Sequence, residues 1–145
     1  MLILSPALRE KMLLHSRNGL PNEACGLLAG IIDGGAKKVT DVYCLKNIDE
    51  SPEHFSMSSE EQFSAVSSMR KRGLTLLGNF HSHPATPARP SEEDIRLAFD
   101  SSLSYVILSL AATEATADAA AKAVVKSFII HKTEHSVSEE PVESE

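Results

Sequence analysis

The strongest constraint on the fold of this chain is a hairpin that begins with an apolar segment. Residues 25–32 read C-G-L-L-A-G-I-I, a short apolar run that predicts a buried strand. Asp33-Gly34-Gly35 follows, and glycine readily adopts the positive φ angles that a tight turn between strands requires. Residues 38–45 then predict the return strand. Because a hairpin makes its two strands antiparallel, the sheet cannot be purely parallel.

Helices and further strands are expected around this hairpin. Ser5 followed by Pro6 is a strong helix start, because serine caps a helix and proline suits its first position. Ser59-Glu60-Glu61-Gln62 has the form of a capping box. We expect helices over residues 6–18, 59–72 and 91–101, the last burying Ile95, Ala98 and Phe99, and strands over residues 25–32, 38–45, 74–83, 104–110 and 123–131.

The chain is expected to form one domain with a short tail. Its 145 residues suffice for a single domain that buries roughly 70% of its extended-chain surface. Strands that alternate with helices, with a hairpin among them, predict an α/β fold whose mixed, mostly antiparallel sheet is flanked by helices. We expect the domain to span residues 1–132, and residues 133–145, with five glutamates, to be a disordered acidic tail. The alanine-rich residues 111–122 fit either a short helix or a loop.

The composition limits the partners and the location of the protein. A net charge of -6 argues against nucleic acid, since phosphate contacts need a basic surface. No apolar run approaches the ~20 residues that cross a bilayer, and the N-terminus lacks a secretory signal. Cys25 and Cys44 match no disulfide framework or Cys-Cys metal spacing. We therefore expect a cytoplasmic protein with reduced thiols and with neither a nucleic-acid nor a membrane partner.

The segment that carries most chemical information is His81-Ser82-His83-Pro84. Residues i and i+2 of a strand point to the same face, about 6.6 Å apart, so the two imidazoles can converge on one ion. A proline-rich loop then turns the chain back, and Asp94 falls in the first turn of the expected third helix. Two imidazole nitrogens and one carboxylate leave a fourth tetrahedral position for water, as in catalytic zinc sites. In isolation, Ser91 and Asp94 are more simply explained as a helix cap and its first-turn acid.

Glu23 precedes the first buried strand, in P-N-E-A-C-G-L-L-A-G. A hydrolytic zinc site needs a carboxylate that is not a ligand, to take a proton from water and pass it to the leaving amine. An acid at the end of a buried strand can reach over the edge of the sheet to do so. Taken alone, Glu23 is more simply a surface glutamate, and only its combination with the two histidines favours a base.

Together, E-A-C-G-L-L-A-G and G-N-F-H-S-H-P-x6-S-x2-D resemble the JAMM (MPN-plus) metallopeptidase family over roughly residues 1–131. The resemblance implies a cytidine-deaminase-like architecture with one Zn²⁺ per chain on His81, His83 and Asp94. It also implies that Glu23 is the general acid and base and that Ser91 stabilises the oxyanion. The chain lacks room for the long insertions of eukaryotic relatives and is similar to compact prokaryotic members, which act on ubiquitin-like sulfur-carrier proteins.

The expected activity is therefore hydrolysis of the amide bond after the C-terminal Gly-Gly of a ubiquitin-like or sulfur-carrier protein. The main alternative is a zinc-bearing scaffold that binds such a partner without cutting it, although Glu23 and Ser91 would then have no purpose. Non-haem iron oxygenases also use two histidines and one carboxylate, but a cupin-like Glu is missing from the positions that follow His83. A DNA-repair-associated relative of the same fold is opposed by the acidic composition.

Overall fold

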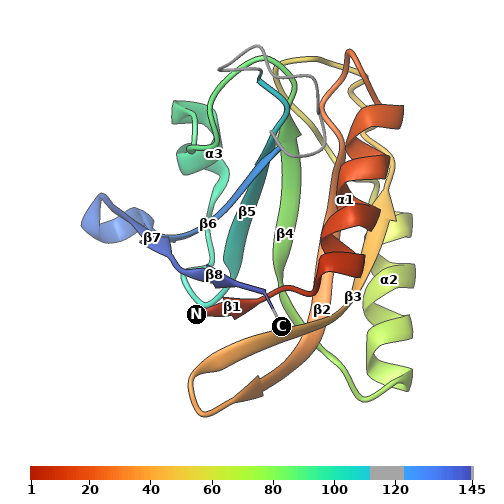
Figure 1. The fold of residues 1–145 in the computed structure, drawn as a ribbon, viewed down its shortest axis with the longest axis vertical. Helices are drawn as coiled ribbons and strands as arrows, with labels where there is room; N and C mark the ends of the chain where they lie inside the picture. The colour runs from red at the N-terminus through yellow and green to blue at the C-terminus, as the bar shows by residue number, and fades with distance from the viewer. Residues whose placement is uncertain (112–122, 145) are drawn as a thin grey trace.

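The computed structural model describes residues 1–111 and 123–144 of the chain (Figure 1). Most of the alanine-rich segment, residues 112–122, therefore lies outside the described residues. The described helices are α1 (Pro6–Asn18), α2 (Ser59–Lys71) and α3 (Glu92–Leu97), with a 3₁₀ turn at Lys132–Glu134. The described strands are β1 (Leu2–Ile3), β2 (Cys25–Asp33), β3 (Ala36–Leu45), β4 (Thr75–His83), β5 (Ser104–Ser109), β6 (Val124–His131), β7 (Ser136–Glu140) and β8 (Val142–Glu143).

All eight strands join one sheet in the order β7-β6-β5-β4-β2-β3-β1-β8. The expected hairpin is confirmed: β2 and β3 are antiparallel, and Gly34 and Gly35 turn between them with φ angles of 58° and 85°. The central strand β4 is antiparallel to β2 but parallel to β5. This mixture of directions confirms the α/β fold class with a mixed sheet and flanking helices.

Helix α1 covers one face of the sheet, in front of it in Figure 1. The Ser5 hydroxyl oxygen caps this helix by accepting a hydrogen bond from the Leu8 amide at 3.3 Å. Met12 and Leu13 of α1 are buried in a core cluster that also holds Leu28 of β2 and Phe80 of β4. Burial of this apolar layer fixes which face of β4 points toward α1.

The opposite face is shared between α2 and α3. Leu27 follows the alternation of a strand and points away from Leu28, toward Ala65 and Met69 of α2. On the far side of β4, Ile107 of β5 belongs to a separate cluster packed near α3. The two helices therefore cover different strands and leave part of this face, next to the end of β4, without a helix over it.

Helix α3 is shorter than the sequence predicts. It ends at Leu97, and Ala98 has an extended ψ of 112°. The Tyr105 hydroxyl on β5 accepts a hydrogen bond from the Asp100 amide at 3.2 Å and donates one to the Asp100 carbonyl at 3.1 Å. These two bonds hold the backbone at Asp100 outside helical geometry. The predicted apolar stripe is therefore wrong for Phe99, whose side chain is 89% exposed.

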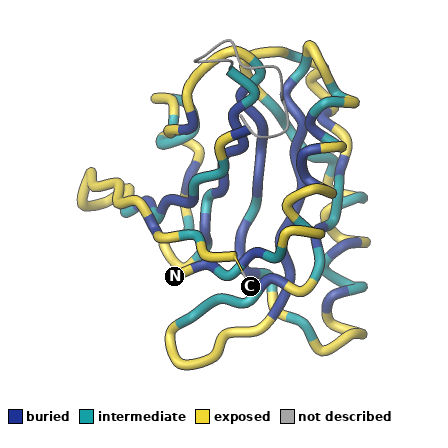
Figure 2. The backbone as a smooth tube through the Cα atoms, viewed as in Figure 1, coloured by how far each residue is buried: buried dark blue, intermediate teal, exposed yellow. Residues whose placement is uncertain are grey.

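The acidic tail is not disordered in the structure, and the predicted domain end at residue 132 is wrong. Strand β7 pairs with β6, and β8 pairs in parallel with β1 (Figure 1). Most acidic residues of this segment are exposed, and much of the segment is yellow in Figure 2. Glu140 is buried, and its Oε1 accepts hydrogen bonds of 2.7 Å from the hydroxyls of Ser104 and Ser127. Composition alone suggested disorder, but pairing with a strand far away in sequence orders the tail.

Within the described ranges, no helix is long and apolar enough to cross a membrane. The cytoplasmic location remains a prediction.

Candidate metal centre

The end of β4 brings two imidazoles together on the face that faces away from α1. His81 and His83 are separated by one residue of the strand, so their side chains share a face. Their ring centroids lie 4.9 Å apart, and their side chains are 3% and 5% exposed. Strand β4 lies between β2 and β5 at this point: His81 pairs with Cys25 of β2, and His83 pairs with Ser109 of β5.

Asp94 approaches the same point from the first turn of α3. Its Oδ2 lies 3.1 Å from His81 Nε2 and 3.2 Å from His83 Nε2. Ser91 fixes this carboxylate through a capping box: the Ser91 amide donates to Asp94 Oδ2 at 2.9 Å, and the Asp94 amide donates to Ser91 Oγ at 3.1 Å. The cap thus sets both the start of the helix and the direction of the carboxylate.

These three donor atoms have the geometry of a metal-binding triangle. The two Nε2 atoms are 3.1 Å apart, so all three edges of the triangle measure 3.1–3.2 Å. Ligands at about 2.0–2.1 Å from a tetrahedral zinc lie about 3.3 Å from one another. Two ring nitrogens this close need a proton or a cation between them, because their lone pairs repel. The residues therefore fit a zinc ion, and the remaining tetrahedral position is open to water.

The two histidines are held in different ways. His83 Nδ1 lies 2.9 Å from the carbonyl oxygen of Pro87 and donates to it, which leaves the Nε2 lone pair free for a metal. His81 Nδ1 is buried and has no hydrogen-bond partner among the described residues. The ring of Phe55 instead stacks on the His81 ring, with centroids 4.7 Å apart and planes inclined by 25°.

The charges of the triangle are mutually stabilised. Burial favours the protonated form of Asp94, but hydrogen bonds from His81 and His83 outweigh it and hold the pKa of this carboxyl well below its usual value. Burial likewise opposes a charge on His83, yet Asp94 and the Pro87 carbonyl raise the pKa of its imidazole. Without metal, the site thus favours the anionic form of Asp94 and shifts His83 toward its protonated form.

Glu23 lies beside the histidines. The Ala24 amide donates to Ser82 Oγ at 2.8 Å, and the Ser82 amide donates to the Ala24 carbonyl at 2.9 Å. Continuing this antiparallel register places Glu23 opposite His83. The side chain is 5% exposed, and burial raises the pKa of Glu23 to about 8, although His83 opposes the rise. Glu23 Oε1 has no hydrogen-bond partner among the described residues.

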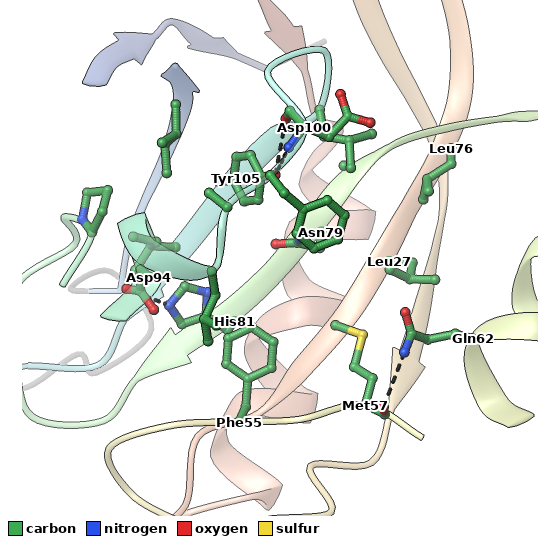
Figure 3. A pocket seen from close by; sticks show the side chains of 18 residues that line it. Leu27, Phe55, Met57, Gln62, Leu76, Asn79, His81, Asp94, Asp100 and Tyr105 are labelled. Atoms are coloured by element: carbon green, nitrogen blue, oxygen red, sulfur yellow. Dashed lines mark hydrogen bonds and ion pairs between the residues drawn. The ribbon is translucent and has the colours of Figure 1, made fainter. Parts of the chain in front are cut away.

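A cavity of about 430 Å³ opens beside the triangle (Figure 3). His81 and Asp94 form one part of its wall, and Phe55, Met57 and Leu27 form another. Most of the remaining lining is apolar and includes Leu76, Ile107 and Ile130 on the face of the sheet between α2 and α3. The cavity is therefore a partly apolar recess that ends at a polar, metal-binding corner.

Other polar residues have structural roles or lie elsewhere. His15 Nε2 lies 3.1 Å from the Cys25 carbonyl and 3.0 Å from the Leu45 carbonyl, so it ties α1 to the hairpin. His54 Nδ1 lies 3.2 Å from Asp49 Oδ2 on an exposed loop. Cys25 and Cys44 are free thiols, as expected.

Two contacts were not predicted from the sequence, the stacking of Phe55 on His81 and the bond from His83 to the Pro87 carbonyl. The second involves a backbone atom, which no residue type can signal. Phe55 lies in a polar, irregular segment, where its aromatic character was the one available hint.

A family model described as prokaryotic homologs of the JAB domain matches residues 5–123 of the chain. The CysO-cysteine peptidase of Mycobacterium tuberculosis is 32% identical over 108 residues, which cover 74% of this chain and 73% of that protein. The desampylase of Pyrococcus furiosus is 36% identical over 73 residues, covering 50% of this chain and 49% of its own length.

Solved structures agree in fold. The solution structure of a protein from Desulfitobacterium hafniense is 55% identical, with a TM-score of 0.86, and covers 100% of this chain and 93% of its own. A JAB1/MPN domain protein from Archaeoglobus fulgidus, 21% identical with a TM-score of 0.56, covers 99% of this chain and 98% of its own and shows the shared fold alone.

Proposed function

The chain belongs to the prokaryotic JAMM (MPN-plus) family and is a hydrolytic enzyme, and we propose that it is a zinc peptidase that cuts after a C-terminal Gly-Gly. The substrate is a ubiquitin-like or sulfur-carrier protein, and the bond is the amide that follows its Gly-Gly tail. The observation that carries this proposal is the convergence of the His81, His83 and Asp94 donor atoms beside the buried carboxyl of Glu23.

One zinc ion per chain would be held by His81 Nε2, His83 Nε2 and Asp94 Oδ2. Two nitrogens and one carboxylate oxygen suit zinc, and three protein ligands are the number found in catalytic zinc sites. When bound, zinc supplies a Lewis acid that lowers the pKa of water toward ~7 and polarises the scissile carbonyl.

Glu23 acts as the general base and then as the general acid. It continues the strand register opposite His83, the charges of His83 and Asp94 act on its carboxyl, and no described hydrogen bond occupies its Oε1. With a cation held in the triangle, the pKa of Glu23 would be lowered, so its carboxyl would be ionised at neutral pH and able to accept a proton. It then takes the proton of the attacking water and delivers it to the leaving amine.

Ser91 stabilises the negative charge that develops on the carbonyl oxygen. Its Oγ accepts a bond from the Asp94 amide, which leaves the hydroxyl hydrogen free to donate. The capping box fixes Ser91 against Asp94, so this donor stands at the edge of the metal triangle before the substrate arrives. Such preorganised donors account for much of the rate enhancement of acyl-transfer enzymes.

The substrate tail would reach the centre through the cavity between α2 and α3. A flexible Gly-Gly end has no side chains, so it can lie along the part of the cavity wall formed by Phe55, His81 and Asp94. The apolar lining next to it suits an apolar residue earlier in the tail. The names of several relatives support this class of partner: one is a CysO-cysteine peptidase, and another is a probable TtuB-protein conjugate cleaving protease from Thermus thermophilus.

Replacing Glu23 tests the enzyme against the scaffold alternative. Glu23→Gln keeps size and polarity but cannot accept a proton, so cleavage should fall by about 10²–10⁴ while zinc stays bound. The assay is the intact mass of a ubiquitin-like carrier with a short peptide fused after its Gly-Gly end. Glu10→Gln, on the exposed side of α1, is the matched control and should cleave at the parent rate.

Two results would contradict the proposal. Cleavage by the Glu23→Gln variant at the parent rate would remove Glu23 from the mechanism. A parent protein that holds zinc and binds the carrier, yet cuts neither the fused peptide nor a lysine-linked conjugate, would be a scaffold.

A further inference from the structure

We propose that the loop of residues 47–57 positions the metal centre, with Phe55 holding the His81 ring and Asn47 fastening the loop. This inference rests on the proposed zinc site. Phe55 and Asn47 are positioning residues, because they act through His81 and Glu23.

The starting point is the difference between the two histidines. A histidine that binds a metal normally donates its second ring nitrogen to an oxygen, and that bond fixes the ring. His83 has such a bond, to the carbonyl of Pro87. His81 has none among the described residues, although its Nδ1 is buried.

Phe55 takes the place of that missing bond. Its ring lies nearly parallel to the imidazole of His81 at a centroid distance of 4.7 Å, and Figure 3 shows it directly below His81 at the corner of the cavity. Stacking of this kind against one face of the ring limits rotation of the imidazole. The same ring keeps water from the face of His81 that it covers.

Asn47 holds Phe55 there by organising the loop. Its amide nitrogen donates to the carbonyls of Glu23 at 3.0 Å and His54 at 3.1 Å, and to Ser51 at a longer 3.4 Å. Its Oδ1 accepts from the amides of Asp49 and Ser56, at 3.0 and 3.2 Å. The side chain is 8% exposed, so solvent cannot easily replace these bonds.

The loop also fixes Glu23. The Glu23 amide donates to the Ser51 carbonyl at 2.8 Å, and the Glu23 carbonyl accepts from Asn47. One loop therefore contacts a metal ligand through Phe55 and the backbone of the general base through Ser51 and Asn47. Loss of Phe55 should disturb only the metal, whereas loss of the Asn47 amide should disturb both metal and base.

The first test measures zinc affinity without any substrate, by competition with a chromophoric chelator. Phe55→Leu should bind zinc about 10–100-fold more weakly, the range for loss of a residue that orients a metal ligand. Phe55→Tyr keeps the ring and should bind as the parent does. Phe63→Leu is the matched control, because Phe63 is 75% exposed on α2 and lies outside the cavity wall.

The second test separates Asn47 from Phe55. Asn47→Asp keeps the shape but replaces a donor by an acceptor that faces three carbonyl oxygens. At saturating zinc, Phe55→Leu should regain a kcat within about threefold of the parent, since its ligands are then loaded. Asn47→Asp should stay at least about tenfold slower in kcat, with little change in KM, because Glu23 is also displaced.

Circular dichroism and melting curves of the metal-free variants establish that each one folds; if Phe55→Leu unfolds, Phe55→Met takes its place. Zinc affinity of the Phe55 variant equal to that of Phe63→Leu would overturn the role of Phe55. Full recovery of kcat by Asn47→Asp at saturating zinc would overturn the role of Asn47. A parent that binds no zinc would instead refute the proposed function, and this inference with it.

Discussion

Glu23→Gln should stabilise the metal-free protein at neutral pH, although it abolishes the proposed base. Burial raises the pKa of Glu23 from an ordinary 4.5 to about 8 in the folded chain. Between these two values the unfolded chain has released the proton and the folded chain still holds it. A carboxyl whose pKa is higher in the folded than in the unfolded chain makes its full contribution to the free energy of unfolding below the unfolded pKa. That contribution is lost as the pH rises through the pKa of the folded chain.

The size of the effect follows from this window. Each pH unit between the two pKa values costs the folded state about 1.4 kcal/mol. From 4.5 to pH 7 the cost is therefore about 3 kcal/mol, and near pH 5 it is below about 1 kcal/mol. Glutamine does not titrate and escapes this cost. For a chain of this length, about 3 kcal/mol corresponds to roughly 6–12 °C in Tm.

Thermal unfolding in the presence of a chelator, followed by circular dichroism from pH 5 to pH 8, measures the difference directly. The variant and the parent should melt close together at pH 5 and diverge steadily toward pH 8. Added zinc should narrow the gap, because a nearby cation favours the carboxylate of the parent. Glu10→Gln, on the exposed side of α1, should follow the parent throughout.

A gap in Tm that stays constant across this pH range would refute the reasoning, since glutamine would then act through packing alone. A variant less stable than the parent at pH 8 would show that the carboxylate is well solvated or paired in the folded protein.

Three further predictions concern the metal and the tail. Chelation should leave the circular dichroism spectrum intact and lower Tm by the lost binding free energy, because the apolar layers of both faces do not include the donors; loss of secondary structure would make the zinc structural. Asp94→Asn should keep the fold but lose zinc on dialysis, and a variant that retained the metal as tightly as the parent would remove Asp94 from the ligands. Glu140→Ala should lower the free energy of unfolding by about 2–4 kcal/mol, because the buried hydroxyls of Ser104 and Ser127 lose the carboxylate that accepts their hydrogen bonds. The exposed Glu143 provides the control for urea unfolding, and equal midpoints for Glu140→Ala and Glu143→Ala would mean that the hydrogen bonds of the Glu140 side chain contribute nothing to the stability.

Local signals in the sequence predicted most helices and strands. Helix α1 begins at Pro6 after its Ser5 cap, as predicted, whereas α2 is capped by Ser58 and not by the predicted Ser59. The hairpin follows from the two adjacent glycines after the apolar run of residues 25–32. Each of these features depends on interactions within about four residues, such as a cap or a tight turn, and a sequence displays such interactions directly.

Predictions from local sequence were wrong where contacts with distant strands decide the structure. The last strands were expected to be disordered because their residues are acidic, yet β8 pairs with β1 from the opposite end of the chain. Helix α3 was expected to continue to Ser101, but Tyr105 of the next strand binds the backbone of Asp100. In both cases the deciding partner is set by the order of the strands in the sheet, which no local pattern contains.

The candidate site divides in the same way. Sequence alone proposed His81, His83 and Asp94, because strand alternation and a helix cap place them within one short segment. Only the tertiary structure put Glu23 opposite His83, by pairing β2 with β4 across more than fifty residues. Only the tertiary structure laid Phe55 on His81, because a loop has no periodicity and its course is fixed by bonds such as those of Asn47. Donor chemistry is thus a local property of the sequence, whereas burial and mutual orientation arise from contacts between segments that are distant along the chain.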